Sequence, residues 1–452
     1  MSQPIADVCI VGLGPAGLGA SLRLAESSMA KRVICVEAGV GADLKTCSIL
    51  EGKGCRFVQP CQIVTGVGGS SLLSGGKISL FPAGRALTSI LGSEDLARER
   101  LLRAFELFSE YVRLLAPGVE SATIQQCNAF FANKGFQFRY YDSYRYRLTD
   151  LVAGYEKMLA KIRACGISIK LETEVEAIEP IAEGFRIRWN SHGNKSELLA
   201  KRIVLAIGRA GKELMGELDA SLHLDGRPRD CDVGVRLEFP TSVWPDIDEC
   251  HKDLKLHFLN ARTFCVCKDG LLAPYRLDDI FLLEGHADPD VKTGFTNLAI
   301  TIRSPGISGE HALGEVRKRL LALSNGKPIR QSLLGFLNKE QQSDQTEKYT
   351  SSISYWQWGS IRDCFPDNVY AEIYEAVAYF ASRLLPDEFH RKVSVYAPEM
   401  DYYWPEFPLH KGFVSNDSSV YVIGDSTGQF RGILQAFCSG LESAEHIVGN
   451  YV

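Results

Sequence analysis

A glycine-rich segment close to the start of the chain, GLGPAG at residues 12–17, most constrains its fold. An apolar run at 7–11 precedes it, and a segment with helical character follows at 15–26. In such a strand–turn–helix unit the first glycine permits a tight turn, the second lets the backbone approach a pyrophosphate, and the third lets helix and strand pack closely. The helix N-terminus then offers free N–H groups and a positive dipole end to phosphate oxygens. The predicted phosphate-binding residues are Gly12, Gly14, Pro15, Ala16 and Gly17.

An acidic residue ends the next apolar segment. The stretch RVICVEAG at 32–39 is typical of a strand buried on both faces, and Glu37 and Ala38 follow its apolar part. Glu37 lies 20 residues after Gly17, at the spacing where an acidic side chain holds a ribose through its hydroxyls. Glu37 and Ala38 are therefore predicted to contact the adenosine end of a dinucleotide.

Two segments far from the N-terminus resemble parts of the two-dinucleotide-binding flavoproteins. RIVLAIGRAG at 202–211 is a buried strand with a glycine turn, and VYVIGDSTGQFRG at 420–432 is a strand followed by Gly-Asp and a helix start. In such flavoproteins the Asp carboxylate meets the ribityl chain, and the helix dipole stabilises negative charge on the reduced flavin. The resemblance therefore predicts FAD as the cofactor. It implies that the binding site includes Val175, Ala206, Gly208, Gly424, Asp425, Gly432 and Ile433.

The predicted fold class is α/β, with a Rossmann-like, glutathione-reductase-like FAD-binding domain and an inserted α+β substrate domain. At 452 residues the chain exceeds one simple core, and beyond residue 230 it changes to short strand-like pieces with several prolines. The FAD-binding domain is expected at 1–229, with a helical and loop insertion at about 85–150, and at 396–452; the substrate domain is expected at 230–395. Helices are expected at 93–117, 148–164, 366–384 and 432–448, and strands at 167–178, 184–189, 202–208 and 420–425.

Five segments, taken in order, resemble the uncharacterised FAD-dependent dehydrogenases of the glutathione-reductase-like superfamily. They are CSILEGKGCRFVQPCQIVTGVGGSSLLSGGKISL, CDVGVRLEFP, ARTFCVCKDG, LEGHADPDVKTGFTNLAITI and IGDSTGQFRGILQAFCSG. The resemblance runs from about residue 8 to residue 447 and implies a flavin-dependent oxidoreductase. The chain departs from the expected pattern at 74–77, which read SGGK in place of SDGK, and at 424–428, which read GDSTG in place of GDGAG.

The loop GVGGSSLLSGGKISL at 66–80 has the glycine density needed for close approach of the backbone to a flavin or a pyrophosphate. Its serines are candidate hydrogen-bond donors. Lys77 is a candidate to neutralise a reduced flavin or to hold an anionic substrate, and the alternative is a solvated lysine after a flexible loop. The loop residues predicted at the cofactor are Gly69, Ser70, Ser74, Gly75, Gly76 and Lys77.

The chain contains 13 cysteines, an odd number without regular spacing, which favours a reducing cytoplasm over a secreted disulfide scaffold. Cys47, Cys55 and Cys61 fit neither a CxxC redox pair nor a zinc knuckle. Cys265 and Cys267, two apart on an apparent strand, would suit joint ligation better than a disulfide. These cysteines are therefore either small buried hydrophobes or part of a redox or metal site, and no metal ligand set is predicted.

Arginines and tyrosines alternate in FRYYDSYRYRLTD at 138–150, which carries Arg139, Arg145 and Arg147. Arginine forks bind carboxylate or phosphate, and tyrosines stack on rings or donate protons. The alternative is a surface strand with alternating aromatic and charged faces. The candidate catalytic residues are Lys77, Arg431, Arg145 and Arg147.

The formal net charge of −5 argues against a nucleic-acid partner. Glycines and a proline interrupt the first apolar stretch, so neither a signal peptide nor a membrane span is expected, and the predicted location is cytoplasmic. No second GxGxxG follows a later strand, so NAD(P)H is expected only as a transient electron donor. The predicted reaction is hydride transfer between flavin N5 and either a small anionic or aromatic substrate or NAD(P)H. A flavin monooxygenase and a non-catalytic redox sensor are the alternatives.

Overall fold

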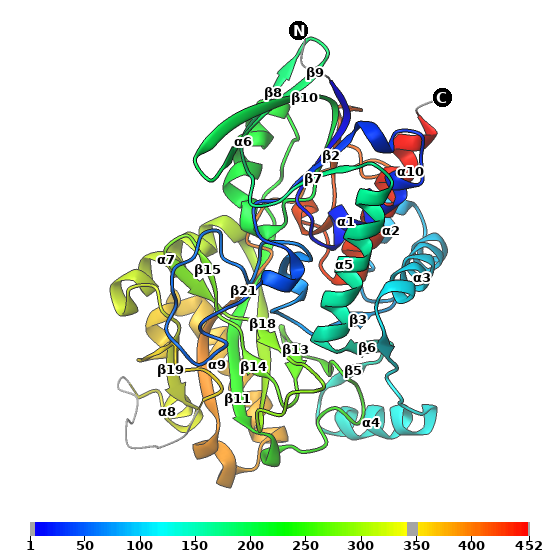
Figure 1. Cartoon of the computed structure of the whole chain (residues 1–452). Coiled ribbons are helices and arrows are strands. Elements are labelled where there is room, and N and C mark those ends of the chain that lie inside the picture. Colours follow the sequence, from blue (N-terminus) through cyan, green and yellow to red (C-terminus); the bar gives the residue numbers. More distant parts are fainter. Residues whose placement is uncertain (1–4, 341–350, 451–452) are drawn as a thin grey trace.

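Two β-sheets, one in each of two lobes, organise the chain (Figure 1). The computed structural model describes residues 5–340 and 351–450. The upper lobe of Figure 1 holds a seven-stranded sheet from the first half and the end of the chain, and the lower lobe holds an eight-stranded sheet. The predicted α/β architecture, a Rossmann-like domain with a second α+β lobe, is confirmed.

The first sheet has the strand order β7-β2-β1-β10-β9-β8, and β22 also pairs with β10. Its bounds are β1 Ala6–Val11, β2 Val33–Val36, β7 Ser168–Lys170, β8 Glu174–Ile181, β9 Gly184–Ser191, β10 Asn194–Leu205 and β22 Val420–Val422. Strands β7, β2, β1, β22 and the end of β10 run parallel, whereas β8, β9 and the start of β10 form an antiparallel meander. Along β1, Val8 and Ile10 pack into one hydrophobic cluster and Cys9 and Val11 into another. Both faces of the sheet are therefore covered, which explains the continuous apolar run.

Helices α1 (Pro15–Ala25) and α10 (Ile433–Gly449) pack directly against each other. Two glycines permit the close crossing, because a Cβ at Gly440 would overlap the carbonyl oxygen of Ala16 and a Cβ at Gly19 would overlap that of Phe437. Since α1 follows β1 and α10 follows β22, both helices begin at the carboxyl edge of the parallel strands. The other helices of this lobe and of the insertion are α2 Leu87–Leu91, α3 Glu94–Tyr111, α4 Ser121–Asn133, α5 Leu148–Ala164 and α6 Lys212–Leu222.

The second sheet has the order β20-β19-β21-β11-β18-β13-β12-β5 and is antiparallel except for the β19–β20 pair. Its bounds are β5 Gln137–Arg139, β11 Asp230–Pro240, β12 Lys255–Phe258, β13 Ala261–Cys267, β18 Phe295–Ser308, β19 Ile329–Ser332, β20 Gln357–Trp358 and β21 Ser394–Asp401. Helices α7 (Gly309–Ser324) and α9 (Asp367–Leu384) pack on it, and α8 spans Leu333–Leu337. Short strands complete the chain: β3 Lys77–Ser79, β4 Leu114–Leu115, β6 Ser143–Tyr146, β14 Leu271–Leu272, β15 Tyr275–Leu277, β16 Ile280–Leu282 and β17 Gly285–His286.

The two lobes share one hydrophobic core. A single cluster of buried side chains contains Val8 and Ile10 of β1 together with Val233 and Ile300 of β11 and β18. The sheets also exchange chain segments: β21 (Ser394–Asp401) spans the boundary expected at residue 395, and β5 brings part of the 85–150 insertion to the second sheet. The sheet of the second lobe is therefore built from two separate stretches of the sequence, 137–139 and 230–401.

One disulfide, Cys127–Cys250, joins α4 to the segment before β12, with the two Cα atoms 5.8 Å apart. The remaining cysteines are free thiols. Among residues 5–340 and 351–450, none of the helices combines the length and the apolar character that a membrane span requires.

We predict that Gly440→Val destabilises the protein strongly. A side chain at residue 440 would overlap the Ala16 carbonyl oxygen and lie 2.7 Å from Ala20 N, so α1 and α10 must separate. The expected cost is about 3 kcal/mol in the free energy of unfolding, measured by urea denaturation. The control is Gly314→Val in α7, where a Cβ meets nothing within 4 Å. Equal unfolding midpoints for the two variants would contradict the close crossing.

Candidate active site

A cavity of about 1180 Å³ opens at the carboxyl ends of β1, β2, β10 and β22 and continues to the second sheet. Its walls include Gly12, Glu37, Gly208 and Asp425 from these strand ends and Arg262 from β13. Ligands of open parallel sheets bind at this edge, where strand order reverses and helix N-termini converge. The cavity therefore extends from the carboxyl edge of the first sheet to the surface of the second lobe.

The glycines of the first turn have the geometry that the sequence predicts. Gly12 has φ +98°, and a Cβ there would overlap the Ala206 carbonyl oxygen; a Cβ at Gly17 would overlap the Gly12 carbonyl oxygen. Gly14 starts α1 without a side-chain cap and faces Gly69, so that a Cβ at Gly69 would lie 3.3 Å from the Gly14 Cα. The first-turn N–H groups of α1 are thus left for a ligand at the cavity.

Glu37 is a buried carboxylate that collects three backbone donors. Its Oε2 accepts a hydrogen bond from Leu13 N–H at 2.7 Å, and its Oε1 accepts from Gly39 N–H and Gly66 N–H, each at 2.9 Å. The side chain is 5% exposed and lines the cavity. Glu37 therefore holds the walls of the cavity in place while it keeps acceptor capacity on Oε2 for a ligand hydroxyl.

A second helix start faces the same cavity. Gly424, Asp425, Gly432 and Ile433 line it, and α10 begins at Ile433 without a side-chain cap. Gly424 and Gly432 have φ +65° and +121°, which glycine adopts without strain. Burial raises the pKa of the Asp425 carboxyl, and Arg431 opposes the shift from 3.7 Å.

A buried charge cluster connects this helix start to the second lobe. Glu284 pairs with Arg209 and, at 2.7 Å, with Arg431, and Arg431 also meets Asp401 of β21 at 2.8 Å. Burial opposes ionisation of Glu284, but the two guanidinium groups outweigh it and lower its pKa to about 2. Arg431, a candidate catalytic residue, thus lies at the cavity with three carboxylates around it.

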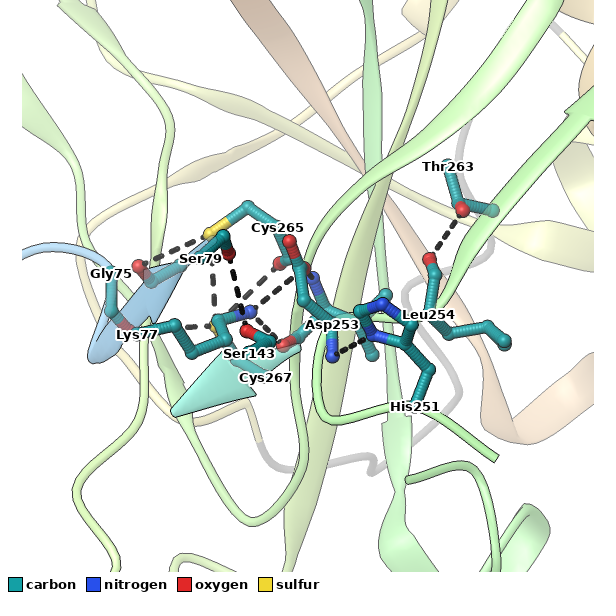
Figure 2. A network of polar contacts seen from close by, with 12 residues as sticks. Gly75, Lys77, Ser79, Ser143, His251, Asp253, Leu254, Thr263, Cys265 and Cys267 are labelled. Atoms are coloured by element: carbon teal, nitrogen blue, oxygen red, sulfur yellow. Dashed lines mark hydrogen bonds and ion pairs between the residues drawn. The ribbon is translucent and has the colours of Figure 1, made fainter. Parts of the chain in front are cut away.

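Lys77 also lines the cavity, but its ammonium is already bonded (Figure 2). It donates to Asp253 Oδ1 at 2.9 Å and to the Val266 carbonyl oxygen. Burial alone would lower the pKa of Lys77, but Asp253 and the neighbouring thiols of Cys267 and Cys265 outweigh it and raise the pKa. The solvated-lysine alternative is therefore wrong, since the side chain is 8% exposed.

Basic side chains of β5, β12 and β13 form the far wall of the cavity, which we call the basic wall: Arg139, Lys255, His257 and Arg262. Arg262 pairs with Asp232. Burial lowers the pKa of Lys255 to about 8; Asp253 opposes this shift, and Arg262 and Lys77 add to it. Burial and the neighbouring cations lower the pKa of His257 to about 4, so its imidazole is neutral at neutral pH.

The structure brings most of the predicted cofactor residues together. The cavity is lined by Gly12, Gly14, Pro15, Ala16, Glu37, Ala38, Gly69, Ser70, Ser74, Gly75, Lys77, Val175, Ala206, Gly208, Gly424, Asp425, Gly432 and Ile433. Gly17 and Gly76 lie behind this lining, where a Cβ would overlap the carbonyl oxygens of Gly12 and Ala287 respectively. Two predicted catalytic arginines lie elsewhere: Arg145 pairs with Asp248 at 2.8 Å, and Arg147 with Asp290 at 2.8 Å.

Sequence reasoning missed six residues at the cavity: Arg209, which follows β10 of the first lobe, and Glu284, Asp401, Lys255, His257 and Arg262 of the second lobe. Three of the six lie inside segments quoted above: Arg209 in RIVLAIGRAG, Arg262 in ARTFCVCKDG and Glu284 in LEGHADPDVKTGFTNLAITI. Of the cysteines, Cys265 lines the cavity, while Cys47, Cys55 and Cys61 pack against hydrophobic clusters. Among the described residues, no group of three or more His, Cys, Asp or Glu side chains is arranged to hold a metal ion.

No family model and no curated protein matches the chain. Its fold is similar to that of pyridoxine 4-oxidase from Mesorbium loti, with 13% identity, 99% of each chain covered and a TM-score of 0.48. It is also similar to a flavoprotein/dehydrogenase from Cytophaga hutchinsonii, with 13% identity, 99% and 78% of the two chains covered and a TM-score of 0.42. A third is the glycerol-3-phosphate dehydrogenase from Bacillus halodurans complexed with FAD, with 13% identity, 100% and 65% covered and a TM-score of 0.40. Membership of the dehydrogenase group named above stays a prediction.

We predict that Glu284→Gln destabilises the protein at neutral pH and not in strong acid. The folded-state pKa of Glu284 is about 2, below the ordinary 4.5, so its ion pairs stabilise the fold above pH 4.5 and are lost as the pH falls toward 2. The expected loss at pH 7 is about 3 kcal/mol, because Arg209 and Arg431 remain buried beside a neutral amide.

Urea denaturation across this pH range measures the difference. The difference in the free energy of unfolding between the wild type and the Glu284→Gln variant should vanish as the pH approaches 2. Glu183→Gln, at an exposed turn, should unfold with the same free energy as the wild type at every pH. A gap that stays constant with pH would contradict the ion-pair account.

Proposed function

We propose that the chain is an FAD-dependent oxidoreductase that transfers hydride between flavin N5 and a small anionic substrate, with NAD(P)H as the alternative hydride donor. The observation that carries the proposal is the cavity itself, where the N-termini of α1 and α10, Glu37 and Asp425 meet a basic wall from the second lobe. Its volume of about 1180 Å³ exceeds the roughly 300–1,000 Å³ typical of a single small-ligand pocket. There is room for a dinucleotide and a substrate together.

Three observations support the fit of FAD. Gly14 and Gly69 face each other across the start of α1 with no side chain between them, which leaves a cradle for phosphate oxygens. Glu37 retains acceptor capacity for ribose hydroxyls. Arg209 Nε and Asp401 Oδ2 are buried and have no hydrogen-bond partner in the part of the chain that the structure describes, and both residues line the cavity. Buried polar atoms of this kind favour a bound polar ligand.

Each wall of the cavity then has a task. The first turn of α1 binds the pyrophosphate, Glu37 accepts from the adenosine ribose, and Asp425 accepts from the ribityl hydroxyls. The start of α10 stabilises negative charge at the pyrimidine edge. FAD, when bound, supplies the two-electron chemistry. The buried Glu284–Arg431–Arg209 cluster fixes the wall between the cofactor side and the basic wall.

The basic wall supports an anionic substrate. Lys77, Arg139, Lys255 and Arg262 carry four positive charges around this part of the cavity, and two carboxylates, Asp253 and Asp232, pair with Lys77 and Arg262. The Lys255 ammonium lies 4.9 Å from the centre of the Phe264 ring and is 8% exposed as a residue. An incoming carboxylate or phosphate would relieve the surplus positive charge, and Phe264 offers a ring face beside it.

We predict that the purified protein binds FAD and that Gly14→Val and Asp425→Ala lower its FAD content at least about tenfold. Gly14 has φ −64°, and a Cβ there lies 3.8 Å from Gly69, so valine fits the fold but fills the phosphate cradle. The measurements are the flavin absorbance per protein and the circular-dichroism melting temperature. The controls are Gly54→Val and Asp246→Ala, both at exposed positions.

Anaerobic mixing of the yellow protein with NADH, NADPH and small hydroxy or amino acids tests the reaction. Bleaching of the flavin by one of these donors is expected. Full FAD occupancy in both variants would overturn the assignment of the cofactor site. Oxygen consumption coupled to hydroxylation of the substrate would overturn the dehydrogenase assignment in favour of a monooxygenase. If none of the donors reduces the flavin, the assignment would be overturned in favour of a redox sensor.

We predict that benzoate, a probe for an anionic ring-bearing ligand, perturbs the flavin spectrum and binds at least about tenfold more tightly than neutral benzamide. Because the pKa of Lys255 is about 8, its positive charge is present below that pH, and benzoate affinity falls as the pH rises through 8. Lys255→Met weakens benzoate binding and removes this pH dependence. The matched control is Lys268→Met, since Lys268 pairs with Asp248 at 2.8 Å outside the cavity lining. Equal affinities for benzoate and benzamide would contradict the anionic substrate.

A further inference from the structure

Two cysteine thiols, Cys265 and Cys267, lie next to each other between the basic wall and the glycine-rich loop at 66–80, which we call the glycine loop (Figure 2). The sulfurs of Cys265 and Cys267 at the end of β13 are 3.8 Å apart. Cys265 is partly exposed and lines the cavity, whereas Cys267 is fully buried behind it. The pair therefore has one member open to a ligand and one member sheltered from solvent.

An irregular backbone makes this pairing. Cys265 has φ +47°, and the register of β13 against β18 shifts between Phe264 and Cys267. A left-handed residue other than glycine costs about 1 kcal/mol or more, so the surroundings must hold it. Arg236 donates from Nε and Nη2 to the carboxylate of Glu399, and from Nη1 to the Cys265 carbonyl oxygen at 3.0 Å.

The pocket around the inner sulfur is closed by glycines. A Cβ at Gly285 would lie 2.8 Å from the Cys267 sulfur, and a Cβ at Gly270 would lie 2.8 Å from the Cys267 Cβ. Gly285 in β17 and Gly270 before β14 thus leave room for the side chain of Cys267, which a side chain at either position would meet. The site is fitted to a sulfur atom held beside Cys265.

The charges around the pair favour one thiolate. The hydrogen bond from Cys267, and then the positive charges of Lys77 and Arg236, lower the pKa of Cys265 below that of an ordinary thiol, against burial and Asp253. The same hydrogen bond raises the pKa of Cys267. At neutral pH the pair therefore carries one proton and one negative charge, with the thiolate on the cavity side.

We propose that Cys265 and Cys267 form a redox-active dithiol that closes to a disulfide at the cavity wall and exchanges two electrons with the flavin. This inference rests on the proposed function for its electron acceptor. The bond that forms is Sγ–Sγ, and the bond that breaks is the S–H of Cys267. Two electrons and that one proton pass to oxidised flavin, which would give the two-electron-reduced, anionic flavin, so charge and atoms balance.

The geometry permits this closure. A disulfide has an S–S distance of about 2.05 Å, so the two sulfurs must approach by roughly 1.8 Å. A regular strand holds residues two apart with nearly parallel side chains, and the left-handed turn at Cys265 removes that constraint. Lys77, bonded to Asp253 and the Val266 carbonyl oxygen, lies beside both sulfurs in Figure 2 and stabilises the thiolate in the open form.

The first test needs no flavin. Protein stripped of cofactor is equilibrated in oxidised and reduced glutathione, and peptide mass mapping follows the Cys265–Cys267 disulfide beside the Cys127–Cys250 disulfide. We expect a reversible Cys265–Cys267 bond that Cys265→Ser abolishes. At about pH 6, iodoacetamide should modify Cys265 at least about tenfold faster than Cys165, a partly exposed thiol in another part of the fold, and Cys267→Ala should slow it about tenfold. Absence of the bond at every glutathione ratio overturns the inference.

The second test uses the FAD-loaded protein. Anaerobic dithiothreitol should reduce the disulfide and then bleach the flavin in the wild type, and Cys265→Ser and Cys267→Ser should slow the bleaching at least about tenfold, whereas Cys165→Ser does not. A protein that binds FAD but bleaches equally fast in all four forms overturns the exchange and leaves the proposed function intact. A protein that forms the bond but binds no FAD overturns the proposed function and, with it, the exchange.

Discussion

The carboxylate of Glu37 is the interaction on which the cavity depends. It joins backbone N–H groups of Leu13, Gly39 and Gly66, which belong to three separate loops around the carboxyl edge of the first sheet. Hydrogen bonds to a charged acceptor contribute about 1.5–3 kcal/mol each, more than neutral ones. The glycine turn before α1, the end of β2 and the start of the glycine loop are therefore held at fixed distances by one side chain. The two helix starts can face one cavity because this edge is rigid.

The fold of the first lobe could be predicted from the sequence because its motifs are local. A glycine turn must sit between a strand and a helix that are neighbours in the chain, so Gly12, Gly14 and Glu37 could be placed from spacing alone. The basic wall and the buried charge cluster could not be predicted, because their members are brought together only by the tertiary fold. Asp401 and Lys255 lie on strands of the second sheet, and Glu284 lies in the short connection between β16 and β17. Arg145 and Arg147 also show that the tertiary partners of a side chain cannot be predicted from the local sequence. Their residue type suited an anion site, but the fold pairs each with a carboxylate outside the cavity.

The irregular end of β13 is a backbone feature that could not be predicted from the sequence pattern. Alternation along a strand predicts that Cys265 and Cys267 point the same way, and the sequence gives no sign of the register shift that brings their sulfurs to 3.8 Å. That shift depends on tertiary partners: Arg236 on the carbonyl oxygen and two glycines beside the inner thiol. Bulges at such places are frequent beside functional sites, because they redirect a side chain without changing the rest of the sheet.

The core shared by the two lobes bears on how ligands reach the cavity. In many two-domain enzymes a hinge opens a cleft, and the interface between the domains is small and polar enough to part. Here Val8 and Ile10 of β1 belong to the same buried cluster as Val233 and Ile300, and separating the lobes would expose that apolar surface to water. The Cys127–Cys250 bond further ties the insertion to the second lobe. Exchange of substrate and product must therefore proceed through movements of side chains and loops at the mouth of the cavity, within a frame that stays closed.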